Sequence, residues 1–236
     1  MNQGLAAYFE KTDSHSRISG MNLKDLKNLV RQGENSTLEF KLKANHPEKI
    51  IREIVAFANT KGGKLLVGVG DDKTIPGLKF VDEEEYMLVR AIERNCFPPL
   101  HYNIERIAVT DERDVLMFTI PQSKEKPHFV QLDHEETGKA YVRVKDRSVQ
   151  ASREVKQILR RENEEGIQFR YGEKEKVLMS YLYENQRITL GKFAEIAKIP
   201  LWLASRTLVL LVLSNVLKIQ PDEVMDWYSL LDERSV

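Results

Sequence analysis

The fold is decided by one continuous stretch, PEKIIREIVAFANTKGGKLLVGVGDD, which covers residues 47–72. Its first half places apolar residues at helical spacing, in particular Ile50, Ile54 and Phe57. This spacing predicts a helix with one apolar stripe, and Asn45 and Pro47 mark its start. The pair Gly62-Gly63 ends the helix, because glycine readily adopts the left-handed backbone of a helix C-terminus. The apolar run 65–69 is short and bounded by glycines, so it predicts a buried strand.

Upstream of this stretch the sequence predicts a helix and a strand. Asn22 is a good N-cap for a short helix, apolar residues follow it at helical spacing, and Gly33 stops it. Residues 37–42 alternate between apolar and polar, as a strand with one buried face does. Residues 1–20 are polar and punctuated by Ser and Gly, which indicates a flexible tail.

Downstream, one helix precedes two pairs of strands. Asp82 is a good N-cap for a helix that runs to about Asn95, and its acidic first turn suits the helix dipole. The predicted strands lie at about 101–109, 114–120, 128–132 and 140–145, with the second pair forming a hairpin. Residues 148–165 predict a strongly charged helix. Together these elements indicate one α/β (α+β) domain over residues 21–165.

After Gly166 the pattern changes to helices alone. Three helices are predicted at 173–184, 189–198 and 200–213, and residues 218–226 leave room for a short wing. Helix–helix–helix–wing over about 60 residues is the spacing of a winged helix-turn-helix. We therefore expect a small, mainly α, winged-helix-like domain over residues 172–236.

The composition excludes several classes of protein. The 236 residues include 36 Lys and Arg against 36 Asp and Glu, so any nucleic-acid contact must come from a local patch rather than from histone-like bulk charge. The longest apolar run, Leu208–Leu213, is far shorter than the roughly 20 residues of a membrane span. No secretory signal is visible, and the single cysteine, Cys96, excludes an internal disulfide. We expect a cytoplasmic protein without membrane contact.

Two glycine-rich segments do not match nucleotide-binding loops. Lys64 follows Gly62-Gly63 as in a phosphate loop, but the next residue is Leu65 rather than Ser or Thr. Gly68-Val69-Gly70 is followed by two carboxylates, which repel a phosphate unless a cation intervenes. ATP hydrolysis is therefore not expected, and both segments are better explained as tight turns.

Three carboxylates are candidates for a metal site. Glu34 and Glu39 flank a turn that enters a strand, and Asp71 ends another strand that we expect to be adjacent. Carboxylates at neighbouring strand ends suit a hard cation, Mg²⁺ or Mn²⁺, which would bridge phosphate oxygens. The alternative is structural, with Glu34 as a helix cap, Glu39 paired with Lys41 or Lys43, and Asp71 in a turn.

The most basic segment runs from Lys139 to Arg161, where eight cations face two anions. Strand alternation would place Tyr141, Arg143 and Lys145 on one face, and an aromatic ring beside two cations suits a sugar-phosphate backbone. The alternative is a solvated surface balanced by nearby acids. The residues predicted to contact nucleic acid are Arg143, Lys145, Arg147, Arg153, Lys41 and Arg206.

The third C-terminal helix supports two interpretations. It offers Trp202, Ser205 and Arg206 on one side, which would face a DNA groove. A continuous apolar run begins at Leu208, and exposed hydrocarbon of that length could equally seal a homo-oligomer, most simply a dimer.

The segment from Gly33 to about Ala151 resembles the AlbA-like domain that Schlafen proteins share with many bacterial DNA-binding or ATP-binding proteins. The resemblance rests on four blocks in family-like order: Leu38-Glu39-Phe40-Lys41, Ala56–Gly63, Leu65–Asp72 and Tyr141–Val144. It implies an α/β fold, and a winged helix behind such a domain implies transcriptional regulation. In Schlafen nucleases three acids hold the metal, and motif for motif these fall on Glu34, Glu39 and Asp71. Bacterial relatives described as DNA-binding share the same acids, so their presence does not establish cleavage.

Three functions are open at this point. The expected one is a nucleic-acid-binding protein, namely a dimeric DNA-binding transcriptional regulator with DNA or RNA as its partner. The second is a divalent-metal-dependent endoribonuclease that uses Glu34, Glu39 and Asp71 as catalytic and metal-binding residues, with Mg or Mn as its cofactor. The third is a nucleotide-sensing or dimerising adaptor.

Overall fold

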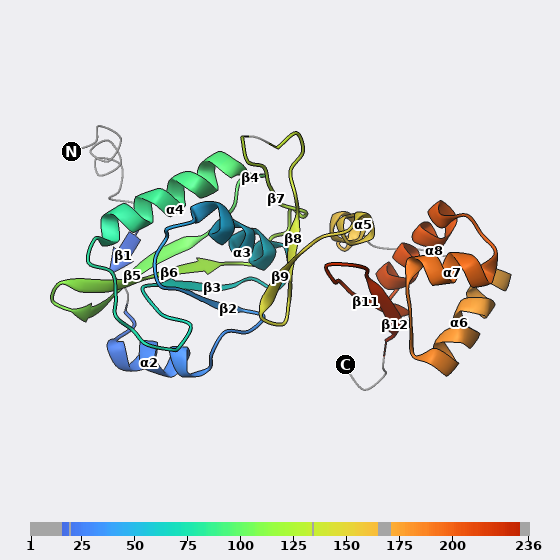
Figure 1. Ribbon diagram of the computed structural model, residues 1–236, viewed down its shortest axis with the longest axis horizontal. Helices are drawn as coiled ribbons and strands as arrows, with labels where there is room; N and C mark the ends of the chain where they lie inside the picture. Colours follow the sequence, from blue (N-terminus) through green and yellow to red (C-terminus); the bar gives the residue numbers. More distant parts are fainter. Residues whose placement is uncertain (1–15, 19, 134, 165–170, 232–236) are drawn as a thin grey trace. The chain divides into compact units, whose positions relative to one another are not determined.

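The computed structural model describes residues 16–18, 20–133, 135–164 and 171–231. The chain forms two compact units, of which the first ends at Ser148 and the second begins at Val149 (Figure 1). Residues 149–164 are therefore grouped with the second unit, whereas the change to helices alone after Gly166 predicts a first domain that ends at residue 165. Most of the predicted tail lies outside the described residues, and its described part includes strand β1 (Ser16–Ile18).

The first unit is built around a mixed five-stranded sheet with the order β1-β5-β6-β3-β2. The pairs β1–β5 and β2–β3 are parallel, and β5–β6 and β6–β3 are antiparallel. The other sheet strands are β2 (Leu38–Lys41), β3 (Gly63–Val67), β5 (Asn103–Thr110) and β6 (Arg113–Ile120). These four confirm the strands that alternation and the glycine-bounded run predict.

Helices cover both faces of this sheet. Helices α3 (Pro47–Asn59) and α4 (Val81–Asn95) lie on one face, and α2 (Leu23–Arg31) lies on the other (Figure 1). Successive side chains of β3 point to opposite faces of the sheet: Leu65 packs in the core under α3 and α4, and Leu66 packs in the core under α2. A strand buried on both faces needs the continuous apolar run that the sequence shows.

The predicted helix starts are partly confirmed. The Asn22 side chain accepts hydrogen bonds from the backbone N–H groups of Lys24 and Asp25, as an N-cap does. The prediction that Asp82 caps α4 is wrong, because α4 begins at Val81 and Asp82 lies inside its first turn. There its carboxylate pairs with Arg106 at 2.7 Å.

The predicted hairpin between residues 128–132 and 140–145 is also wrong. Strand β7 (Phe129–Val130) pairs instead with β4 (Cys96–Phe97), and only an isolated bridge joins Val130 to Lys139. Strand β8 (Tyr141–Val144) pairs with β9 (Arg147–Gln150). The predicted helix therefore starts later, as α5 (Arg153–Arg161), which Ser152 caps.

The described residues of the second unit form four helices and a small antiparallel sheet with the order β10-β12-β11. The three predicted helices are present as α6 (Glu173–Asn185), α7 (Leu190–Ala197) and α8 (Leu201–Leu213). The sheet strands are β10 (Arg187–Ile188), β11 (Leu217–Gln220) and β12 (Trp227–Leu230).

The apolar run of α8 serves the core of its own unit. Leu208 and Leu211 are fully buried and pack with Phe193 and Tyr228. The apolar run from Leu208, on which the expected homo-oligomer rested, is therefore buried at Leu208, Val209 and Leu211. Within the described ranges no single helix reaches the length and apolar character of a membrane span, and α7 and α8 do so only together, across a 114° bend.

Candidate nucleic-acid interface

Glu34 and Glu39 lie next to one another at the start of β2. Glu39 is buried, and one of its carboxylate oxygens contacts Lys41 Nζ. Glu34 accepts a hydrogen bond from the Phe40 N–H at 3.0 Å. Desolvation of its carboxyl group, and then the neighbouring Glu39 charge, raise the pKa of Glu34 above its ordinary value. The pair between Glu39 and Lys41 is the one that the structural alternative to a metal site predicts.

Arg143 is a buried hub rather than a surface cation. Its guanidinium donates to Glu39 Oε2 at 3.0 Å and also pairs with Glu53 of α3. It further donates to the Asn35 carbonyl at 2.8 Å and lies 4.8 Å above the Phe57 ring. The prediction that Arg143 contacts phosphate is corrected, because its side chain has no exposed surface and its charge is matched by two carboxylates.

The predicted tri-carboxylate metal site does not form. Both carboxylate oxygens of Glu39 are engaged by cations, Lys41 on one and Arg143 on the other. Asp71 is exposed, and no group of three His, Cys, Asp or Glu side chains suited to a metal ion occurs in the part of the chain that the structure describes. The residues present therefore do not fit Mg²⁺ or Mn²⁺.

The Phe-Ala-Asn-Thr block and its two glycines are structural. The Asn59 amide donates to the carbonyls of His128 and Tyr141 and accepts from the His128 N–H. Thr60 Oγ1 accepts from the Arg143 N–H at 2.9 Å. Gly62 has a φ of +75°, and a Cβ there would lie 2.7 Å from the Ile120 carbonyl oxygen. The block therefore ties α3 to β7 and β8 and brings the chain closely past β6.

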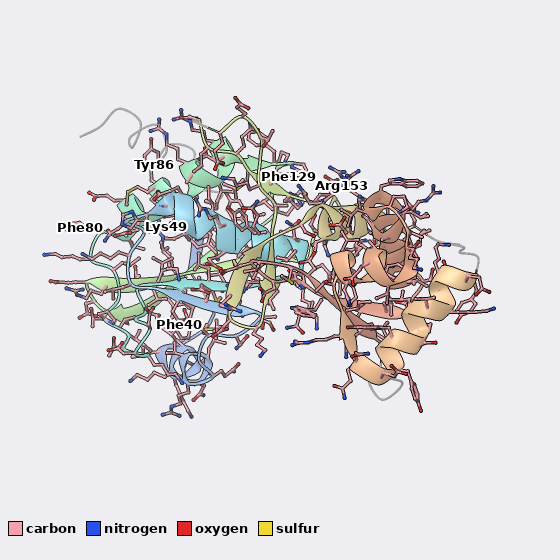
Figure 2. The ribbon with its side chains drawn as sticks, turned by 45° about the vertical axis from the view of Figure 1, so that its right-hand side comes forward. Phe40, Lys49, Phe80, Tyr86, Phe129 and Arg153 are labelled. Carbon is pink, nitrogen blue, oxygen red and sulfur yellow. The ribbon has the colours of Figure 1, made fainter. Side chains whose placement is uncertain are left out.

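A basic groove of about 320 Å³ lies where β2 leads into α3. Its charged or titratable lining side chains are Lys41, Lys43, His46, Lys49 and Asp71, so basic groups outnumber the single acid. Lys43 and Lys49 are exposed, and Lys49 lies in the first turn of α3 (Figure 2). We call this feature the α3 groove. Sequence reasoning missed it apart from Lys41, although three lysines within nine residues were a usable signal.

The remaining predicted cations of the basic segment are exposed. Lys145 is a turn residue with a φ of +58°, Arg147 starts β9, and Arg153 starts α5. The predicted common face of Tyr141, Arg143 and Lys145 is wrong, because the first two are buried and the third lies in the turn after β8.

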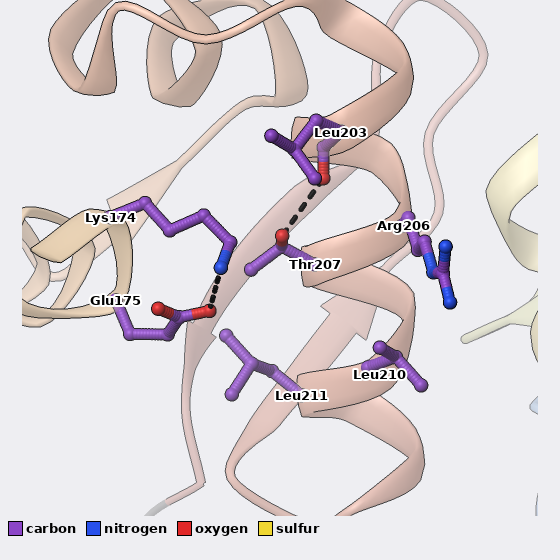
Figure 3. Close-up of a pocket in the computed structure, with 7 residues that line it drawn as sticks. All are labelled: Lys174, Glu175, Leu203, Arg206, Thr207, Leu210 and Leu211. Atoms are coloured by element: carbon purple, nitrogen blue, oxygen red, sulfur yellow. Dashed lines mark hydrogen bonds and ion pairs between the residues drawn. The ribbon is translucent and has the colours of Figure 1, made fainter. Parts of the chain in front are cut away.

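On α8 only part of the predicted surface is available. Ser205 is buried and donates a hydrogen bond to Glu154 of α5, whereas Trp202 is 63% exposed and Arg206 is exposed. Arg206 lines a groove with Lys174, whose ammonium pairs with Glu175 at 2.8 Å (Figure 3). The Arg206 side chain extends away from that pair (Figure 3).

Comparisons with known proteins give one family and two structural neighbours. The model of the family described as Schlafen, AlbA_2 matches residues 34–152. The N-terminal domain of a RecG-related protein from Nitrosomonas europaea is similar in structure, with 20% identity, a TM-score of 0.40, and coverage of 52% of this chain and 89% of that one. The DIP2311 protein from Corynebacterium diphtheriae has 17% identity and a TM-score of 0.37, and the match covers 64% of this chain but 29% of that one. No curated protein matches the sequence.

Proposed function

The chain belongs to the Schlafen AlbA_2 family, and from this membership together with its exposed basic surfaces we propose that it is a nucleic-acid-binding protein. More specifically, we propose a DNA-binding transcriptional regulator. The observation that carries the proposal is the α3 groove, which gathers basic side chains in a chain with no net charge.

The α3 groove suits a phosphate for two physical reasons. Lys43 and Lys49 are exposed cations, and each phosphate contact by such a cation releases a counterion from the nucleic acid. The groove also lies at the N-terminus of α3, where the helix dipole favours an anion.

The second unit supports the more specific proposal. Its elements follow the order helix, strand, helix, helix, strand, strand from α6 to β12, which is the order of a winged helix. In that arrangement α8 is the groove-reading helix, and Trp202 and Arg206 are its exposed side chains. A major groove would be read mainly through Arg206, because arginine donates two hydrogen bonds to guanine.

The ion pairs of Glu39 make the ribonuclease alternative the less favoured one. Glu34 and Glu39 are neighbours, but Glu39 is held by Lys41 and Arg143, so its oxygens serve an ion-pair network. The nucleotide-binding alternative is not favoured either, since the Gly62 N–H is bonded to the Phe57 carbonyl and does not face a phosphate.

Binding to labelled duplex DNA at several salt concentrations tests the proposal. The double variant Lys43→Ala/Lys49→Ala should weaken binding of all sequences similarly and reduce the log–log salt slope by about two. The matched control is Lys24→Ala/Lys27→Ala, which removes two exposed lysines of α2 and should leave the slope unchanged. An unaltered slope in the Lys43/Lys49 variant would contradict the assignment of the α3 groove.

A further inference from the structure

One face of the small sheet in the second unit carries an unusual set of side chains. Arg187 of β10, Ser229 of β12 and Lys218 of β11 are directly opposite one another across the three strands. In the next row of the same face, Trp227 is opposite Gln220. Ile188 and Tyr228, the neighbours of these residues along β10 and β12, are buried in the core. The residues of the two rows therefore point to the opposite, outer face of the sheet. We call these five residues the outer sheet face.

The outer sheet face is hollowed and basic. A groove of about 510 Å³ runs over it, and its lining includes all five residues together with Tyr183 of α6. The two charged residues of the lining, Arg187 and Lys218, are both cations. Tyr183 is 87% exposed. The groove therefore combines positive charge, two aromatic rings and polar side chains.

Arg187 and Trp227 form the centre of this groove. The guanidinium carbon lies 4.1 Å from the centroid of the indole ring, which is a close cation–π contact. The contact holds the planar guanidinium over one face of the ring while Arg187 stays exposed. A flat aromatic surface next to fixed, planar donors matches a nucleobase followed by its phosphate.

We propose that the outer sheet face binds single-stranded nucleic acid, with a base stacked in the Trp227–Tyr183 groove and phosphates bound by Arg187 and Lys218. This inference rests on the proposed function and deepens it. A single strand is favoured over a duplex because a base must leave its stack to reach a ring on a sheet surface. An acidic peptide would satisfy the cations but leave both aromatic rings without a role.

Tryptophan fluorescence of the full-length protein tests the proposal directly. The sequence contains two tryptophans, so Trp202→Phe makes Trp227 the sole indole. In that background, titration with a 20-mer oligo(dT) should quench the Trp227 emission. Anisotropy of the labelled oligomer should show that Arg187→Ala and Trp227→Ala each weaken binding roughly tenfold, which is within the range of one lost stacking contact.

Conservative variants separate contact from folding. Trp227→Phe keeps a ring and should retain most of the affinity, and Arg187→Gln should lose it while the urea midpoint stays unchanged. Oligo(dT) that binds without quenching Trp227, or equal affinity in Arg187→Gln and wild type, would overturn the proposal. Equal quenching by poly-glutamate would also overturn it, in favour of an acidic peptide.

The two proposals can fail independently. Lys43→Ala/Lys49→Ala should weaken duplex binding and leave the Trp227 quenching by oligo(dT) in place. If duplex binding depends on Lys43 and Lys49 but oligo(dT) does not bind the outer sheet face, this inference alone is wrong and the proposed function stands. If neither nucleic acid binds, the proposed function fails with it.

Discussion

Arg143 Nη1 lies 3.0 Å from Glu39 Oε2, and both side chains are buried. The two residues are 104 positions apart in the sequence, so the contact joins β8 to β2. The most conspicuous cation of the basic segment and the most conspicuous acid of the Glu-Phe-Lys block thus neutralise one another. Each looks like a functional residue in the sequence, and together they form part of the core.

Replacing Arg143 by Ala should destabilise the first unit strongly. The change removes the ion pairs of Arg143 with Glu39 and Glu53, although Lys41 still contacts Glu39, and loss of one partner from a buried pair costs about 3–5 kcal/mol. Urea denaturation measures the free energy of unfolding. The control Lys145→Ala, at an exposed turn residue, should change it by less than about 0.5 kcal/mol. A stable Arg143→Ala protein with weakened DNA binding would reverse this assignment.

Asn59→Asp should also destabilise the protein. The amide nitrogen of Asn59 donates to two carbonyls, those of His128 and Tyr141, and a carboxylate cannot replace a donor. Each buried carbonyl left without its partner costs about 1–3 kcal/mol. Thermal unfolding by circular dichroism should show a lower Tm at neutral pH. An unchanged Tm would mean that the two carbonyls find other donors.

His128 should make the first unit sensitive to acid. The Pro98 carbonyl only accepts, so Nδ1 donates to it at 2.9 Å, and in the neutral ring Nε2 accepts from the Ser123 hydroxyl at 2.7 Å. Burial lowers the pKa of His128 below its ordinary value of 6.5. The unfolded chain therefore binds the proton first as the pH falls, and this contribution to stability, complete above pH 6.5, is lost below it.

The free energy of unfolding of His128→Gln should fall less steeply between pH 7 and pH 5 than that of wild type. The matched control is His46→Gln, because His46 is exposed and is not among the groups that shift the pKa of His128. Urea titrations at a series of pH values give both slopes. Equal slopes in His128→Gln and wild type would show that another group controls the acid response.

Added Mg²⁺ or Mn²⁺ should leave the Tm unchanged. A cation that binds only the folded protein raises the Tm by mass action, but Glu39 is already paired with Lys41 and Arg143. Differential scanning calorimetry with millimolar metal and with EDTA compares the two conditions. A rise that disappears in Glu39→Gln would restore the metal site.

The helices and most sheet strands were predictable because their signals are local. Helix α3, the buried strand β3 and the three helices of the second unit follow from apolar spacing and from Gly62-Gly63. The burial of Arg143 was not predictable, since its partners Glu39 and Glu53 lie 104 and 90 residues away. Period-two alternation predicts that side chains share a face of β8, but it does not say which face meets α3.

The candidate surfaces also divide into those predictable from local sequence and those that depend on long-range packing. Exposure of Lys145, Arg147 and Arg153 agrees with their charge, whereas the cross-strand row of Arg187, Ser229 and Lys218 arises from the pairing of three short strands. No sequence period links those three positions. Strand register, which tertiary packing decides, creates this surface.

The hydrogen bond from Ser205 to Glu154 decides where the second unit can be excised from the chain. Both side chains are buried, and Ser152 in turn bonds to Asp226, so α5 is fastened to both ends of the α8–β12 segment. A recombinant fragment that starts at residue 172 would strip α5 from α8 and leave the Ser205 hydroxyl without its acceptor. The portable module, for domain fusion or for transplantation, therefore includes α5 together with its cap Ser152.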